Sequence, residues 1–344
     1  MKPSDGAMNR RRFLVAGSQG VGGLALGSVV AGGWGAQGYA AVNRFAYDIE
    51  RFRTTDPKLL LYELTGRFPS PDPAARRIVC GAGGHFFIAG RQGVNVVDAS
   101  GRLVRLIEAG MPVRCVAVAP SGTVYAGVRD HVEVFDPDGR RLKAWETPAR
   151  KAWLTGLAVS GDEVFVADSG NRLIWRCNAE GKVVGRIGEK NTERHVPGLI
   201  LPSPYLDVKV GGDGLLRVNN SGRHRVEVYT VDGDLEFLWG KPSAAIEGFC
   251  GCCNPVGLAL LPDGRYITCE KGLPRVKRYS AEGNFEGVVA GPESFPKNAQ
   301  AGKARDSEDG TMGGLDAAVD ARGLVCVLDL VAAEVQIYQP KGGG

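Results

Sequence analysis

Residues 115–145 read CVAVAPSGTVYAGVRDHVEVFDPDGRRLKAW and contain four short runs of alternating or β-branched residues. The runs span 115–119, 123–126, 131–135 and 141–145, and Gly122 and Gly139 stand in two of the turns between them. Runs of this kind, bounded by Gly and Pro, predict β-strands joined by tight turns. Four such strands cannot bury both faces of their sheet alone, so the stretch predicts one unit of a repeating β structure.

The same pair of turn signals recurs along the chain. The first glycine of each pair is Gly84, Gly122, Gly161, Gly214, Gly264 or Gly323, and the second is Gly101, Gly139, Gly181, Gly233 or Gly283. The two members lie 17 to 20 residues apart, and successive pairs lie 38 to 59 residues apart. This period, in a chain whose 50 glycines and 19 prolines are spread throughout, predicts an all-β fold, a six-bladed β-propeller.

The last repeat is one strand short. Strands are predicted at 315–319, 324–329 and 334–338, and the sequence ends at the turn that follows. Segment 58–64, KLLLYEL, is the predicted donor of the missing outer strand, because closing the ring in this way covers the edge that the incomplete blade would expose to aggregation. A seventh blade would need strands within 291–314, where the composition predicts a loop.

Two stretches, VFVADSGNRLI at 164–174 and DPDGR at 136–140, resemble the NHL-repeat family of β-propellers. The resemblance covers residues 57 to 340. It implies that Asp168, Asn171 and Arg172 brace neighbouring loops and have no catalytic role. The predicted organisation is a signal peptide or anchor at 1–40, a linker at 41–56 and the propeller at 57–344.

The N-terminal region has the features of an export signal. NRRRFL at 9–14 resembles the twin-arginine motif, and an uncharged, weakly hydrophobic stretch follows at 15–33. The small residues around Ala40 and Ala41 suit cleavage, whereas an uncleaved segment would be a membrane anchor. Both outcomes stay open. The predicted location is the periplasm or another extracytoplasmic compartment.

The formal net charge of +4 does not indicate a nucleic-acid partner. Lys2, Arg10, Arg11 and Arg12 against Asp5 account for +3 of it, which leaves +1 for residues 41–344. Nucleic-acid binding requires a basic stripe or patch, and the sequence contains no long basic run. The predicted partner is a protein of the cell envelope.

Eight cysteines are unevenly distributed. Cys80 and Cys115 are predicted to begin inner strands, Cys177 to lie in a third strand and Cys326 in a second, where small buried residues are expected. Cys250, Cys252 and Cys253 fall in FCGCCNP at 249–255, and Cys269 opens the next loop of the same blade. Both loops are predicted to emerge on one face, so the four sulfurs are expected to converge near the channel mouth.

Three chemistries could use these cysteines. Cys250, Cys252, Cys253 and Cys269 supply four soft ligands for an iron–sulfur cluster or a thiolate-bound metal. Alternatively, Cys252 and Cys253 could form a vicinal disulfide of the kind that lies beside the cofactor in quinoprotein dehydrogenases. The third alternative is structural disulfides, which would stabilise a loop and have no further role. The sequence leaves all three open.

GCCNP at 251–255 and EKGLPRVK at 270–277 resemble a bacterial group of exported NHL-repeat proteins. The resemblance does not include Cys250 and Cys269. It implies that Cys252 and Cys253 carry the common function as the cofactor-binding or redox pair.

Function in propellers is usually carried by loops around one mouth of the channel. Repeat alignment places the following candidate binding residues there: Arg91, Arg129, Asn219, Asn254, Glu270, Lys271 and Asp329. No nucleophile, base or paired catalytic carboxylates can be assigned, so whether the protein is an enzyme stays open.

The leading hypothesis is an exported redox, electron-transfer or metal-binding accessory protein that works through the cysteine-rich loop. The first alternative is a noncatalytic protein-binding scaffold of the cell envelope. The second is a gluconolactonase-like hydrolase whose metal would be held by Asn219, Asp168, Glu270 and Asp329. Arg91 and Arg129 oppose the second alternative, because they stand where ligands for a divalent cation would be needed.

Overall fold

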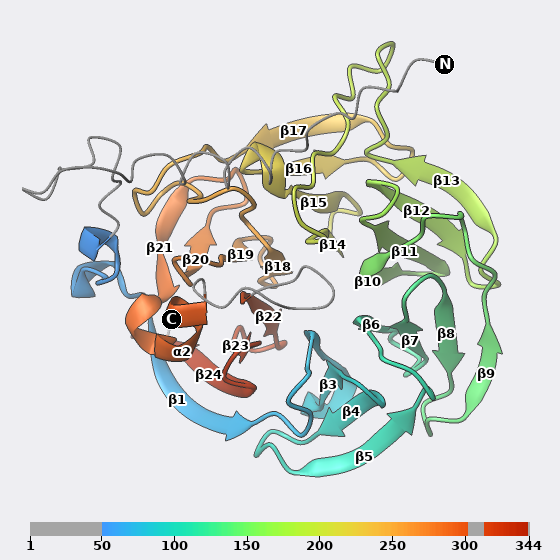
Figure 1. Ribbon diagram of the computed structural model, residues 1–344, viewed down its shortest axis with the longest axis horizontal. Helices are drawn as coiled ribbons and strands as arrows, with labels where there is room; N and C mark the ends of the chain where they lie inside the picture. The colour runs from blue at the N-terminus through green and yellow to red at the C-terminus, as the bar shows by residue number, and fades with distance from the viewer. Residues whose placement is uncertain (1–49, 302–312, 343–344) are drawn as a thin grey trace, which may run out of the picture. The chain divides into compact units, whose positions relative to one another are not determined.

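The computed structural model describes residues 50–301 and 313–342. These residues form six four-stranded antiparallel sheets arranged as blades of a ring (Figure 1). The prediction of a six-bladed β-propeller is therefore confirmed. The predicted signal or anchor at 1–40 lies outside the described residues. No helix in the described ranges is long and apolar enough to cross a membrane.

Five blades follow the chain order. Blade one holds β2 (Arg77–Cys80), β3 (Phe86–Ala89), β4 (Gly93–Val97) and β5 (Leu103–Glu108), and blade two holds β6 (Cys115–Val118), β7 (Val124–Gly127), β8 (Val132–Phe135) and β9 (Arg141–Ala144). Blade three holds β10 (Leu154–Ser160), β11 (Glu163–Asp168), β12 (Leu173–Asn178) and β13 (Val183–Ile187), and blade four holds β14 (Val208–Val210), β15 (Leu216–Asn220), β16 (Arg225–Tyr229) and β17 (Leu235–Trp239). Blade five holds β18 (Gly257–Leu260), β19 (Tyr266–Cys269), β20 (Val276–Tyr279) and β21 (Phe285–Ala290).

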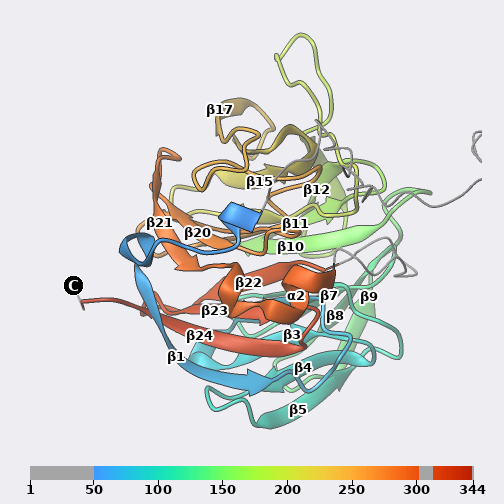
Figure 2. The same cartoon turned by 60° about the vertical axis from the view of Figure 1, so that its left-hand side comes forward.

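The sixth blade combines both ends of the propeller. It holds β22 (Leu315–Val319), β23 (Val325–Asp329), β24 (Glu334–Pro340) and, outermost, β1 (Tyr62–Pro69). β1 runs antiparallel to β24, from Tyr62 opposite Pro340 to Pro69 opposite Glu334 (Figure 2). The predicted segment 58–64 contributes only its last three residues to this strand, because η2 (Pro57–Leu59) is a 3-10 turn capped by the Asp56 carboxylate.

The recurring glycines all have a positive φ, and at two of them packing also excludes a side chain. Gly181, in the last turn of blade three, has φ of +91°, and a Cβ there would lie 2.4 Å from the ring of Trp145 in blade two. Gly283 repeats the arrangement against Trp239. Each turn thus needs a left-handed conformation and also gives room to a tryptophan of the preceding blade. The positive φ that every recurring turn shares explains why the glycine period predicts the blades.

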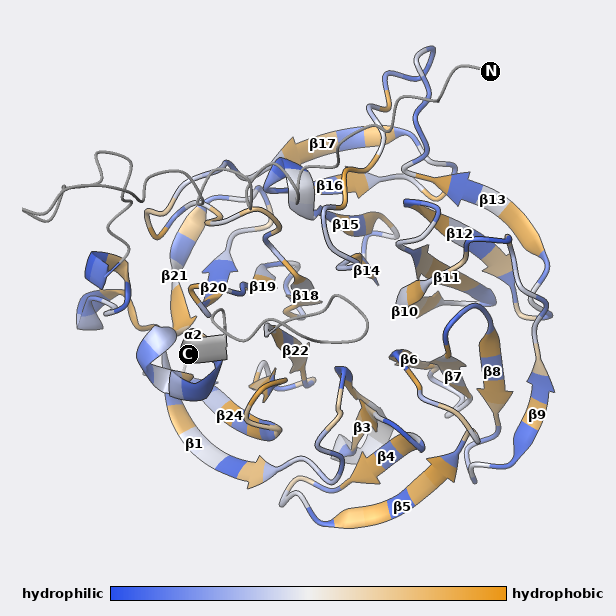
Figure 3. Cartoon of the chain, viewed as in Figure 1, coloured by the Kyte–Doolittle hydropathy of each residue, from blue (hydrophilic) through white to orange (hydrophobic). Residues whose placement is uncertain are grey.

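The hydrophobic core lies between blades. Figure 3 shows hydrophobic residues along middle strands such as β3, β7, β8 and β11. In one cluster, Ile88 and Val97 of blade one pack with Cys326, Leu328 and Val335 of blade six. Neighbouring blades therefore bury each other, as expected for a sheet too small to form its own core. Within 291–314, the structure describes η5 (Pro292–Ser294) and helix α2 (Pro296–Ala301) where a loop was predicted.

Candidate functional site

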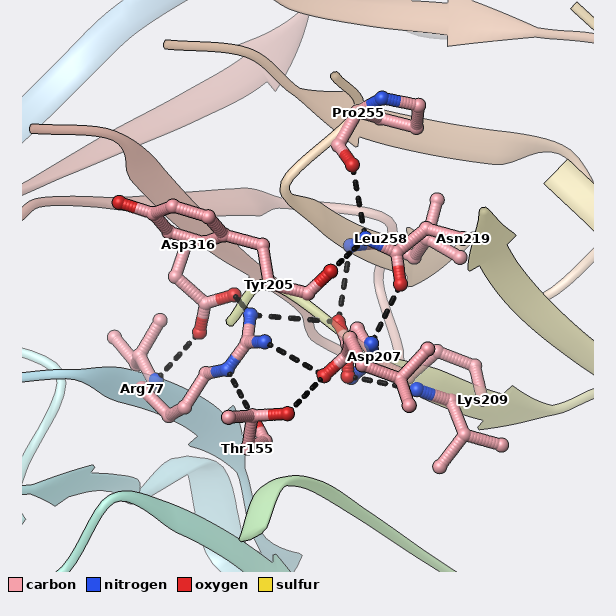
Figure 4. Close-up of polar contacts among 12 residues, drawn as sticks. Arg77, Thr155, Tyr205, Asp207, Lys209, Asn219, Pro255, Leu258 and Asp316 are labelled. Carbon is pink, nitrogen blue, oxygen red and sulfur yellow. Dashed lines mark hydrogen bonds and ion pairs between the residues drawn. The ribbon is translucent and has the colours of Figure 1, made fainter. Parts of the chain in front are cut away.

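Charged and polar side chains from the inner strands meet near the axis of the ring, and we call them the axial cluster: Arg77, Thr155, Asp207 and Asp316, which are buried, and Lys209, which is half-buried (Figure 4). The Arg77 guanidinium lies at its centre, with Nη1 2.7 Å from Asp316 Oδ1 and 3.5 Å from Asp207 Oδ2. Its Nε donates to the Thr155 carbonyl at 3.0 Å. Lys209 Nζ donates to Asp207 Oδ1 at 2.7 Å.

The same carboxylates tie the inner strands together. Asp316 Oδ2 accepts from the Ile78 amide at 2.8 Å, and Asp207 Oδ2 accepts from the Leu258 amide at 3.0 Å. Thr155 Oγ1 donates to the Leu206 carbonyl at 2.8 Å. Side chains or backbone groups from blades one, three, four, five and six thus meet at one point, and the cluster fixes how these blades are placed around the axis.

The two carboxyls respond differently to burial. Burial opposes the ionisation of Asp207, but Arg77 and Lys209 outweigh it and lower its pKa. For Asp316, burial prevails over the attraction of Arg77, and its pKa is raised.

The axial cluster divides the channel into two cavities. A small cavity of about 40 Å³ lies on the side where the inner strands begin, lined by Arg76, Arg114, Tyr205 and other residues. A larger cavity of about 250 Å³ lies on the side where they end, and we call it the lower cavity. We call the face on the side of the small cavity the loop face. The segment that enters β18 at its first residue, including 249–255, lies on this side.

The residues 249–255, which we call the cysteine loop, bring two thiols together on the loop face. The Sγ atoms of Cys252 and Cys253 lie 3.2 Å apart. Cys252 is exposed and Cys253 is buried, with Ser203 Oγ 3.4 Å from the Cys253 sulfur. The hydrogen bond with Cys253, together with partial burial, raises the pKa of the Cys252 thiol, whereas the charge of Lys271 lowers it in part. The pair has one thiol that a partner can reach and one that it cannot.

A buried ion cluster anchors the chain that leads into this loop. Glu270 Oε2 accepts from Arg275 Nη2 at 2.7 Å, and Glu270 Oε1 lies 2.8 Å from Lys277 Nζ. All three side chains are almost inaccessible to solvent. Arg275 also donates to the Ala244 carbonyl at 3.0 Å, and Lys277 donates to the carbonyls of residues 246 and 248. Burial lowers the pKa of Lys277 to about 8.

Asn254 joins the cysteine loop to the neighbouring turn of blade five. Its side-chain amide donates to the carbonyls of Cys250 and Lys271, and its Oδ1 accepts from the Lys271 amide at 2.9 Å. The Cys250 amide donates to Glu270 Oε2 at 3.1 Å. Asn254 and Glu270, both predicted as mouth-binding residues, are thus hydrogen-bonded to protein groups that hold the loop in place.

The four predicted sulfur ligands lie in three different environments. Cys269 is buried beside the axial cluster, where burial and the charge of Asp316 raise its pKa well above its ordinary value. Cys250 lies beside Arg275 and Glu270. Within residues 50–301 and 313–342, no group of three Cys, His, Asp or Glu side chains could hold a metal ion. The four-thiolate metal or iron–sulfur site remains a prediction without geometric support.

The remaining predicted mouth residues divide into structural and exposed ones. Asn219 is buried, with Oδ1 accepting from the Asp207 amide and Nδ2 donating to the Pro255 carbonyl at 2.8 Å. Asp329 is buried and accepts from Asn298 and from two turn amides. Arg91 and Arg129 are exposed. The Arg129 guanidinium carbon lies 5.4 Å from the centroid of the Trp153 ring.

The residues predicted to hold a hydrolase metal are hydrogen-bonded to other groups of the protein. Asp168 accepts from the amides of Trp153, Gly170 and Asn171 and from the Asn171 and Trp175 side chains. This is the bracing role predicted for it. Asn219, Glu270 and Asp329 are bound to protein groups in the same way, and Arg77 stands on the axis. The arrangement does not favour a gluconolactonase-like site.

The other four cysteines are mostly small buried residues, as predicted. Cys115, Cys177 and Cys326 are buried, whereas Cys80 is half-buried. Cys80 ends its inner strand and does not begin it, because Arg77 is the first residue of β2. The neighbouring Cys80 of blade one, together with burial, raises the pKa of the Cys326 thiol in blade six.

Sequence reasoning missed Arg77, Asp207 and Asp316. A signal was present, because charged residues within or beside the short apolar inner strands RIVC, VKV and LDAAV are costly to bury unless they are paired. It also missed Trp153 on the loop face, whose ring lies close to both Arg114 and Arg129; the Arg114 guanidinium carbon is 4.1 Å from its ring centroid.

Comparison with known proteins bears on the fold alone. No protein-family profile matches the sequence, and no curated protein matches it. A streptogramin B lyase is 14% identical, with a TM-score of 0.55, over 81% of this chain and 98% of its own. A catalytically inactive virginiamycin B lyase from Staphylococcus aureus with quinupristin is 11% identical, with a TM-score of 0.54, over 79% and 82%. The WD40 propeller domain of Doa1 is 12% identical, with a TM-score of 0.54, over 82% and 98%.

Proposed function

We propose that the protein is a thiol–disulfide redox accessory protein whose working group is the Cys252–Cys253 pair. The observation that carries the proposal is the 3.2 Å separation of the two sulfurs, one exposed and one buried. Thiol–disulfide exchange needs an accessible attacking thiol and a second thiol within reach of it. Thiol–disulfide exchange by this pair requires neither an iron–sulfur cluster nor a metal bound by four thiolates.

The exchange proceeds in two steps with a disulfide-bearing partner as oxidant. The Cys252 thiolate attacks one sulfur of the partner disulfide, and the other partner sulfur leaves as a thiolate that takes up a proton. Cys253, after losing its proton to solvent, attacks the Cys252 sulfur and releases the second partner thiol. Two electrons pass from the pair to the partner, and a Cys252–Cys253 disulfide remains.

Alkylation of the reduced protein tests which thiol reacts. We expect iodoacetamide to label Cys252 first, because it is the exposed cysteine of the eight. Its raised pKa keeps the thiolate fraction small at pH 7, so labelling should accelerate as the pH rises toward 9. Replacing Cys253 with Ala removes the main cause of the raised pKa, and labelling of Cys252 at pH 7.5 should become about three- to tenfold faster. Peptide mass spectrometry over time measures both rates.

Oxidation with glutathione disulfide completes the test. The peptide that contains residues 252 and 253 should lose two hydrogens in the wild type, and Cys253→Ala should accumulate a mixed disulfide at Cys252. Two free thiols in the wild type after prolonged oxidation would refute the redox function. Cys177→Ala is a matched control, since Cys177 is buried in a third strand and should not change either result.

A noncatalytic scaffold is the second candidate, and the surface around Trp153 favours it. Propellers often bind proteins. Arg114 and Arg129 flank the half-buried Trp153, whose indole N–H is buried and has no hydrogen-bond acceptor among the described residues. Cation and aromatic side chains of this kind are common at the centres of interfaces. Envelope-partner binding that survives Cys252→Ser with Cys253→Ser but is lost in Trp153→Ala would support the scaffold over the redox protein.

Export through the twin-arginine route is part of the proposal. We expect Arg10→Lys with Arg11→Lys to reduce the extracytoplasmic fraction by about tenfold or more in a bacterial host, because the transporter reads the arginine pair. Cell fractionation with immunoblotting measures the distribution. Arg12→Lys is the control, since it changes the variable position of the motif and should leave export intact. Unchanged export in the double variant would contradict this route.

A further inference from the structure

The lower cavity combines an apolar wall with a single charged side chain. The second halves of all six inner strands surround its volume of about 250 Å³. Its side chains include Val118, Val159, Val210, Leu260 and Val319, and the charged one is Lys209. The five apolar side chains are half-buried, so the cavity opens toward the face opposite the cysteine loop.

The wall also carries backbone groups. Strands β2, β6, β10, β14, β18 and β22 are each the first or last strand of their sheet, and one edge of each has no neighbouring strand. Such edges present N–H and C=O groups that are not used by the sheet. A ligand in the channel can therefore make polar contacts as well as apolar ones.

Lys209 gives the cavity a positive charge. Its Nζ donates to Asp207 Oδ1, while Arg77 lies 3.5 Å from the other oxygen of the same carboxylate. Asp207 thus lies within ion-pair distance of two cations, of which Arg77 pairs more closely with Asp316, at 2.7 Å. An ammonium group has three N–H donors, and this hydrogen bond uses one. The Lys209 side chain keeps 23% of its surface exposed, on a residue that lines the cavity.

We propose that the lower cavity binds a small carboxylate with a short apolar chain, with its carboxylate on Lys209 and its chain along Val159 and Val319. Ligand pockets for drug-sized molecules are about 300–1,000 Å³, so a cavity slightly below that range suits a molecule of about ten non-hydrogen atoms. Octanoate has this size and charge. A cationic ligand is disfavoured by Lys209, and an uncharged one gains at most a hydrogen bond without the attraction between charges.

Calorimetric titration of the full chain with three eight-carbon probes tests the proposal. Octanoate should bind with a dissociation constant on the order of 0.1–1 mM, which is typical of a ligand this small. Octan-1-ol should bind about tenfold more weakly, and octylammonium should give no binding heat. Equal affinity for octanoate and octan-1-ol would overturn the role of the charge.

Two variants locate the binding. Lys209→Met keeps the length of the side chain and should weaken octanoate binding about tenfold, to the level of octan-1-ol. Because that variant also removes a partner of Asp207, Val159→Phe provides a second test that fills the cavity without touching the axial cluster. It should abolish octanoate binding while circular dichroism shows a folded propeller. Unchanged binding in Val159→Phe would place octanoate elsewhere and overturn the site.

The binding is independent of the redox proposal. Cys252→Ser with Cys253→Ser changes only the opposite side of the axial cluster and should leave octanoate affinity unaltered. Loss of affinity in this double variant would show that the probe binds at the cysteine loop, against the assignment to the lower cavity.

Discussion

Arg77→Met is expected to destabilise the propeller by about 3–5 kcal/mol at pH 7, the range for removing one partner of a buried ion pair. The variant leaves Asp207 and Asp316 buried at the axis with only Lys209 to balance them. Urea unfolding followed by tryptophan fluorescence measures the free energy of unfolding. Arg91→Met is the matched control: it makes the same replacement at an exposed arginine and should change stability by less than about 0.5 kcal/mol.

The pH dependence of this loss has a defined sign. Without Arg77, the folded-state pKa of Asp316, already raised by burial, rises further above its unfolded value. A carboxyl of this kind binds more protons in the folded state, so its contribution to stability is lost as the pH rises through the folded pKa. The deficit of the variant relative to wild type should therefore shrink between pH 7 and pH 5. Asp316→Asn added to Arg77→Met should likewise recover part of the stability, and a deficit that grows in acid would argue against the cluster.

The sequence predicts the blades well because the same local requirement is repeated. Gly181 and Gly283 show it: each needs a positive φ and space for a tryptophan of the preceding blade, and no other residue satisfies both. Strand β22 was predicted with its observed bounds, whereas β1 was predicted four residues too early. The run of leucines at 59–61 predicts a strand of blade six. Instead, the Asp56 cap begins a 3-10 turn that includes Leu59, and Leu60 forms an isolated β-bridge with Val288 of blade five.

The site was predicted less completely because its geometry depends on contacts between blades. Cys250 and Cys269 were predicted to lie close together because their sequence positions put both beside loops on the same face. Cys269 is the last residue of β19 and lies opposite Gly257 of the innermost strand, which directs it to the axis. The closest ion pair of Arg77 joins it to Asp316, 239 positions away in the chain, and no local pattern could show which carboxylate Arg77 meets. The Cys252–Cys253 pair was located because adjacent residues need no long-range contact.

Glu270→Gln is expected to cost about 3–5 kcal/mol of stability and to loosen the cysteine loop. The amide has the shape of the carboxylate but leaves Arg275 and Lys277 as buried cations with no counter-charge from residue 270. Chemical unfolding measures the loss. Limited proteolysis should cut within 241–255 at least about tenfold faster, since both cations also hold carbonyls of this segment. Glu282→Gln, at an exposed turn of the same blade, should have neither effect.

The pH response of Glu270→Gln should be opposite to that of Arg77→Met. Burial lowers the pKa of Lys277 to about 8, and Glu270 raises it, so removing the carboxylate should lower it further. A lysine whose folded pKa is below its unfolded value binds fewer protons in the folded state, and stability then increases with pH between the two values. The folded pKa of Lys277 is lower in the variant, so the variant begins to gain stability at a lower pH than the wild type. The difference in the free energy of unfolding between the two proteins should therefore shrink between pH 6 and pH 8. The loss of stability caused by removing the buried cation Arg77 should therefore become smaller in acid. The loss caused by removing the buried anion Glu270 should become smaller in alkali. If both losses became smaller in the same direction of pH, this assignment of charges would be contradicted.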